Sequence, residues 1–117
     1  SDLASVRVGA VAGTSTEEAL THMRITYRTF TTPLDGLKAL RARTIDAFVY
    51  DRPLLAWLIR QNLSSSIELL DKTFDVQDYA FALPSGSPLR KSVNIAVLDA
   101  RRSEWWDQTT FQYFGSK

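Results

Sequence analysis

Apolar and polar positions along the chain follow two alternating periods, which predict strands and helices in turn. Apart from Arg7, residues 6–11 are apolar and rich in β-branched side chains, and they run on to Gly13, which predicts a buried strand followed by a tight turn. Thr14 and Ser15 each have a Glu three positions later, the pattern of a capping box. We therefore expect a short helix from about Ser15 to a point before Ile25.

The rest of the chain repeats this order of strand and helix. Thr32 followed by Pro33 predicts the start of a second helix, because proline costs least at the first helical position. The other predicted elements are strands at 25–30, 45–50, 67–70 and 79–83, and helices opening after residue 51, running from about 87 to 100, and spanning about 104–114. Strand then helix, three times over, predicts an α/β fold with an open, mostly parallel sheet and flanking helices.

Composition narrows the classes of partner. The chain has 117 residues, of which 14 are Lys or Arg and 13 are Asp or Glu, with 44% hydrophobic residues. This length suits one domain, or part of a larger one, with a core that needs no disulfide, and the chain contains no cysteine. A net charge of +1 gives no excess with which to bind a run of phosphates, so nucleic acid is not the expected partner. No apolar stretch is long enough to span a membrane.

Two helix starts are candidates for ligand binding, because open α/β sheets bind ligands outside the carboxyl ends of their strands. The first is the turn Gly13, Thr14, Ser15 and Thr16, whose amides and hydroxyls, with the helix dipole, suit a carboxylate. The second is Asp51, an acid that suits an ammonium group. For each segment taken alone, simple helix capping is the commoner explanation. Together they offer one site for each charge of an amino acid.

Other residues give little sign of catalysis or metal binding. His22 is the single histidine, and no serine or cysteine is arranged with it as a nucleophile. The chain shows no spacing typical of metal ligands, and we expect no cofactor. Trp105 and Trp106 are adjacent, so on a helix they cannot both face one core. One of them is expected to seek a partner outside this chain.

Several sequence segments of the chain resemble the second half of a type 2 periplasmic-binding-protein domain. This group contains the bacterial extracellular solute-binding proteins of family 3 and the ligand-binding cores of ionotropic glutamate receptors. These segments are VGAVAGTST at 8–16, GLKAL at 36–40, IDAFVYDRP at 45–53, YAFALPSGSPL at 79–89 and YFG at 113–115. The resemblance implies that the turn at Gly13, Thr14, Ser15 and Thr16 binds a ligand carboxylate and that Asp51 binds the α-ammonium group.

The chain departs from that group because the first lobe is missing, together with its ligand-binding arginine and aromatic residue. The resemblance implies that residues 1–78 form the second lobe and that residues 79–117 return to pack on the first. The apolar side chains of this return segment would then lack their surface; they are Leu89, Val93, Ala96, Val97 and the two tryptophans. We expect the isolated chain to cover them by forming a homodimer, by exchanging segments, or by folding the last helices onto its own sheet.

The function expected from this resemblance is a non-enzymatic lobe that binds a small zwitterion, above all an amino acid. The parent is expected to be a glutamate-receptor-like ion channel in a membrane or an amino-acid uptake receptor, with the lobe periplasmic or extracellular. The aspartate after Tyr50 and the aromatic tail favour the channel slightly. The alternatives are an enzyme of the same fold, a dehydratase or transglycosylase-associated module with Asp51 and Tyr50 as its acid or base, and the effector domain of a cytoplasmic transcription regulator.

Overall fold

The computed structural model describes the backbone of residues 6–62, 65–74 and 78–110, and the side chains of these residues except Asn62 and residues 102–110. The elements in chain order are β1 (Val8–Val11), α1 (Ser15–His22), β2 (Tyr27–Phe30), α2 (Pro33–Arg41), β3 (Ala47–Asp51), α3 (Arg52–Asn62), β4 (Ile67–Leu69), β5 (Tyr79–Pro84) and α4 (Arg90–Thr110). No helix among the described residues has both the length and the apolar character that a membrane span requires.

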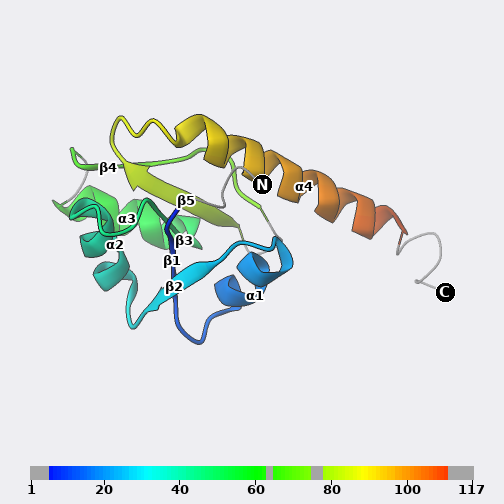
Figure 1. Ribbon diagram of the computed structural model, residues 1–117, viewed down its shortest axis with the longest axis horizontal. Helices are drawn as coiled ribbons and strands as arrows, with labels where there is room; N and C mark the ends of the chain where they lie inside the picture. Colours follow the sequence, from blue (N-terminus) through cyan, green and yellow to red (C-terminus); the bar gives the residue numbers. More distant parts are fainter. Residues whose placement is uncertain (1–5, 63–64, 75–77, 111–117) are drawn as a thin grey trace.

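The strands form one sheet in the order β2-β1-β3-β5-β4 (Figure 1). Strand β1 pairs in parallel with both β2 and β3, whereas β5 runs antiparallel to β3 and to β4. Four strands therefore point one way and only β5 points the other way. This arrangement confirms the predicted α/β fold with an open, mostly parallel sheet.

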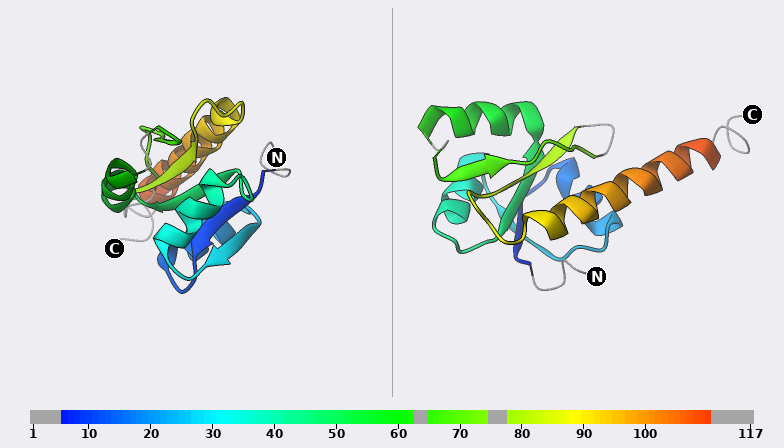
Figure 2. Two further views of the ribbon diagram at one scale, coloured as in Figure 1. Left: turned by 90° about the vertical axis from the view of Figure 1, so that its left-hand side faces the viewer. Right: turned by 90° about the horizontal axis from the view of Figure 1, so that it is seen from above.

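Helices cover both faces of the sheet, and the strands supply alternate side chains to each. One core contains Ala19 and Leu20 of α1 and Val93 and Val97 of α4. The other contains side chains of α2 and α3, namely Leu37, Leu40, Leu55 and Ile59, with Val11 and Phe48 of the sheet. Helices α1 and α4 thus share one face, and α2 and α3 share the other. The right-hand view in Figure 2 shows α3 and α4 with strands between them.

The C-terminal helix differs from the prediction. Two helices were expected, at 87–100 and 104–114, but the structure has one continuous helix, α4, from Arg90 to Thr110. The physical reason is that neither glycine nor proline stands between Ala100 and Glu104, so nothing there ends the helix. Ser87 lies in the preceding turn instead, where its Oγ accepts a hydrogen bond from the Leu89 N–H at 3.1 Å. The predicted end at Phe114 lies outside the described residues.

The first half of α4 packs on the chain's own sheet. Val93 and Val97 are fully buried, and Leu89, Ala96 and Ala100 pack partly buried against the same core. This is one of the three ways in which we expected the chain to cover these side chains. The packing of residues 79–117 on a second lobe stays a prediction, and the same holds for dimerisation and segment exchange.

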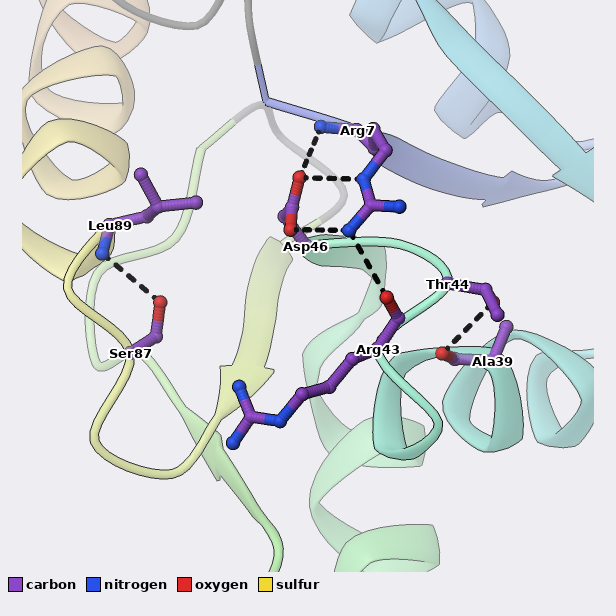
Figure 3. A network of polar contacts seen from close by, with 7 residues as sticks. All are labelled: Arg7, Ala39, Arg43, Thr44, Asp46, Ser87 and Leu89. Carbon is purple, nitrogen blue, oxygen red and sulfur yellow. Dashed lines mark hydrogen bonds and ion pairs between the residues drawn. The ribbon is translucent and has the colours of Figure 1, made fainter.

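An ion pair and its hydrogen bonds align the starts of β1 and β3 (Figure 3). The Arg7 N–H and Nε donate to Asp46 Oδ2 at 2.8 and 3.1 Å, and Arg7 Nη2 donates to Asp46 Oδ1 at 3.1 Å. The same Nη2 donates to the Arg43 carbonyl at 3.1 Å, and the Asp46 N–H donates back to the Arg7 carbonyl at 2.7 Å. Hydrogen bonding to Arg7 lowers the pKa of Asp46 below its ordinary value of 3.8.

We predict that Asp46→Asn weakens the fold at neutral pH and that this effect disappears in acid. The folded-state pKa of Asp46 lies below the unfolded value, so its ionised form stabilises the fold above about pH 4, and this contribution is lost as the pH falls through the folded-state pKa. Urea unfolding of both proteins from neutral pH to about pH 2 measures it. A stability difference that stays constant over this range would contradict the assignment.

A second prediction concerns Gly36 in α2, where a Cβ would overlap the buried ring of Phe48. Glycine to alanine normally stabilises a helix by about 1 kcal/mol. Here we expect Gly36→Ala to destabilise the fold by about 1–3 kcal/mol, because a fully packed ring must move. Urea unfolding checks this, with Lys38→Ala on the exposed side of the same helix as the control. A gain in stability for Gly36→Ala would contradict this prediction, because it would show that the Phe48 ring can move aside without cost.

Candidate functional site

The two segments singled out from the sequence follow neighbouring strands. Strands β1 and β3 are parallel and adjacent, so their carboxyl ends lie at the same edge of the sheet. From β1 the chain enters α1 on one face, and from β3 it enters α3 on the other face. Such a point, where successive helices leave to opposite faces, is the usual ligand crevice of an open α/β sheet. Gly13 to Thr16 and Asp51 flank it.

The turn after β1 is held by a carboxylate from its own helix. Gly13 has a φ of +77°, a conformation that favours glycine, and a Cβ added there would meet no atom within 4 Å. The Gly13 N–H donates to Glu17 Oε2 at 2.6 Å, and Tyr27 Oη donates to Glu17 Oε1 at 3.0 Å. The Glu17 side chain thus reaches back to the turn, as the capping-box pattern suggests. It accepts a hydrogen bond from the Gly13 N–H, however, and not from the N–H of the N-cap residue Thr14.

The hydroxyls of the turn have different roles. Thr14 is the N-cap of α1, but its side chain makes no capping hydrogen bond and donates instead to the Val11 carbonyl at 2.7 Å. Thr14 Oγ1 and Thr16 Oγ1 are also hydrogen-bonded at 3.1 Å, and Thr16 is fully buried. The Thr16 hydroxyl is therefore a structural group, and neither its side chain nor its backbone is exposed to a ligand. Ser15 is exposed.

At this helix end, only the amide of Ser15 is an open donor, because Thr16 is fully buried. The first turn of a helix has no intrahelical acceptors for its N–H groups. Within the described part of the chain, no side chain accepts a hydrogen bond from the Ser15 amide. The Ser15 amide and hydroxyl can therefore donate hydrogen bonds to an anion from solvent.

Tyr79 is a site residue that sequence reasoning missed. It begins β5, where its backbone pairs with Asp51 of β3, and its hydroxyl hydrogen-bonds to Ser15 Oγ at the start of α1. Its ring is 4% exposed and packs edge-on against Phe74, with centroids 5.8 Å apart. One side chain thus connects the two predicted segments. The sequence signal is a tyrosine at the end of an apolar strand, where its buried hydroxyl needs a polar partner.

Asp51 caps the next helix with one of its two oxygens. Asp51 Oδ1 accepts a hydrogen bond from the Leu54 N–H at 2.8 Å, so the capping alternative is correct for this oxygen. Among the residues that the structure describes, Oδ2 has no hydrogen-bond or ion-pair partner. The half-buried carboxylate therefore keeps one free acceptor at the sheet edge.

Arg52 places a positive charge on the other side of Asp51 from the turn. Its Nη2 lies 3.9 Å from Asp71 Oδ1, and its backbone N–H donates to the Asp78 carbonyl at 3.0 Å. Its Nε is buried and has no hydrogen-bond partner within the described residues. Asp71 follows β4 and Asp78 precedes β5, so these contacts direct Arg52 away from β1 and β2.

An open hollow lies beside α1, on the β2 side of the turn. The lining residues are Thr14, Glu17, Glu18, Thr21, His22 and Tyr27. Asp51 does not line it, and of the two segments predicted from the sequence only the turn contributes to it, through Thr14. No group of three or more potential metal-binding side chains occurs in the described part of the chain.

Comparison with family models and with curated protein sequences finds no match. Among solved structures, the fold is similar to the ligand-binding core of GluR0 from Nostoc punctiforme in complex with L-glutamate, with a TM-score of 0.60 and 24% identity over 96% of this chain and 53% of that one. It is also similar to the arginine-, lysine- and histidine-binding protein ArtJ from Geobacillus stearothermophilus, with a TM-score of 0.54 and 18% identity over 99% of this chain and 52% of that one.

The chain spans about half the length of these structures, as a single lobe does of a two-lobed protein. At these identities the likeness concerns the fold. The chain has the fold of one lobe of a type 2 periplasmic-binding protein, the architecture of the amino-acid-binding cores that it resembles.

Proposed function

We propose that this chain is a non-enzymatic ligand-binding lobe for a small zwitterion, an amino acid, and that it works with a second lobe. The observation that carries the proposal is the pairing of two open groups across the ends of β1 and β3. The amide of the exposed Ser15 is a free donor, and Asp51 Oδ2 is a free charged acceptor on the adjacent strand end.

A zwitterion fits these groups with both of its charges. Its carboxylate would accept hydrogen bonds from the amide and hydroxyl of Ser15, and its ammonium group would donate to Asp51 Oδ2. Each hydrogen bond to a charged group contributes about 1.5–3 kcal/mol, and the helix dipole adds about 0.3–1 kcal/mol. Adjacent strands lie about 4.8 Å apart, a separation that one small molecule can span.

The same geometry supports binding over catalysis. A general acid or base must reach a reacting group, and acid–base chemistry normally pairs two such groups. In the described part of the chain, Asp51 Oδ1 bonds only to a backbone N–H, and no second titratable side chain contacts this carboxylate.

A partner lobe is part of the proposal, because half of a cleft leaves half of the ligand in water. The isolated chain is expected to bind with millimolar affinity at best, since association entropy is still lost while half of the contacts are missing. Closure of two lobes onto the ligand would then drive gating of a channel or delivery to a transporter, with the lobe periplasmic or extracellular.

The test is a titration of the isotope-labelled chain with L-amino acids at constant ionic strength, followed by NMR. Saturable shifts at the amides of Gly13 to Thr16 and of residues 51–54 are expected. Asp51→Asn keeps the α3 cap, because asparagine caps as well as aspartate, but removes the charge. We predict that it weakens binding about tenfold, or ~1.4 kcal/mol, with little change in stability.

Two further variants make this test specific. Asp51→Ala should lose the cap as well as the binding, at a cost of about 1 kcal/mol in stability. Asp71→Asn removes an equal charge from a side chain that is 91% exposed beyond β4, and it should leave the affinity within about twofold. Unchanged affinity in Asp51→Asn, or no shift at the turn with any amino acid, would overturn the proposal.

A further inference from the structure

Charge is distributed unevenly between the two edges of the sheet, although the chain as a whole is nearly neutral. Helices α1, α2 and α3 begin at the carboxyl edge of the parallel strands and end at the opposite edge. The described carboxylates at the carboxyl edge are Glu17, Glu18, Asp35, Asp51, Asp71 and Asp78. The cations there are Arg52, Lys72 and Arg28, whose guanidinium carbon lies 5.1 Å from the ring centre of Phe30 at the end of β2. Arg24, Arg41, Arg43 and Arg60 lie at or near the helix ends of the opposite edge.

Within this acidic edge, the ligand turn has a negative charge fixed beside it. Glu17 is held by the Gly13 N–H at 2.6 Å and by Tyr27 Oη at 3.0 Å, which leaves its carboxylate further acceptor capacity. Every α-amino acid would bring the same carboxylate and ammonium group to the turn and to Asp51. The charge at Glu17 therefore discriminates between amino acids only through their side chains.

The hollow beside the turn is where a side chain would lie. The hollow runs along α1 from Thr14 to His22 and reaches Tyr27 at the start of β2, so a side chain of a ligand held at the turn would enter it at Thr14. Its lining includes Glu17 and the exposed Glu18 but no lysine or arginine. The Arg52 guanidinium lies 3.9 Å from Asp71 Oδ1, on the far side of Asp51.

From this arrangement, and resting on the proposed function, we infer that the site selects amino acids with a cationic side chain, such as arginine or lysine, over dicarboxylic ones. A guanidinium or ammonium group in the hollow would be attracted by Glu17 and Glu18, and a carboxylate would be repelled by both. A unit charge about 4 Å away changes affinity about fivefold even in bulk water, so two carboxylates suffice for at least tenfold discrimination.

The experiment compares L-arginine, L-glutamine and L-glutamate by NMR titration of the chain at constant low ionic strength, read at the amides of Gly13 to Thr16. Arginine is expected to bind at least about tenfold more tightly than glutamate, with glutamine between them. Glu18→Gln changes an exposed residue and should reduce the ratio of arginine to glutamate affinity about threefold or more. Glu17→Gln keeps an acceptor for the Gly13 N–H and should act in the same direction.

Asp71→Asn is the matched control, because it removes the same charge from the end of the edge farthest from the hollow. If the ratio of arginine to glutamate affinity fell equally in Asp71→Asn and Glu18→Gln, the preference would come from the overall charge of the protein. That result would overturn the assignment to the hollow. Glutamate binding as tightly as arginine would overturn the inference while leaving the proposed function intact. Absence of any response at the turn would overturn the proposed function itself, and agmatine binding as tightly as arginine would show that no carboxylate is held there.

Discussion

The parallel alignment of β1 with β3 is the constraint on which the candidate site depends. These strands are neighbours in space but are separated in sequence by a helix, a strand and a second helix, so their register is not set by a short turn. Arg7 and Asp46 set it at one end, where side chain and backbone of each residue bond to the other. Because the starts of the strands are aligned there, their far ends bring Gly13 and Asp51 to the same edge.

The reversed strand β5 gives this edge its remaining contacts. It inserts between β3 and β4, and its first residue, Tyr79, pairs with Asp51 and bonds to Ser15. The candidate site is therefore assembled from the carboxyl ends of two parallel strands and the first residue of an antiparallel one. It also lies next to the loop from β4 to β5, whose Asp71 and Asp78 contact Arg52. A change in the position of β5 would therefore act on both Asp51 and Ser15, because Tyr79 contacts each of them.

The architecture was predictable from the sequence because it depends on local periodicity and on the order of elements. The details that failed depend on contacts between distant residues. The Glu17 carboxylate bonds to Gly13 and Tyr27, and Thr14, the expected hydroxyl cap, donates to the Val11 carbonyl. Tyr79 meets Ser15 across 64 positions of sequence, a contact that no spacing rule can detect. Asp51 caps α3 and still retains a free oxygen, so the two interpretations of this residue are compatible.

Helix α4 is seated on the sheet through Val93 and Val97, while its C-terminal half extends past the strands (Figure 1). At about 1.5 Å per residue, its 21 residues make a rod of about 31 Å that is anchored near one end. It follows directly from β5 through a short turn, in which the Gly86 N–H donates to Glu68 at 3.2 Å and Arg90 pairs with the same glutamate at 3.3 Å. Because the helix is anchored to the sheet near its N-terminal end, a small rotation at the end of β5 would displace its C-terminal end by a much larger distance.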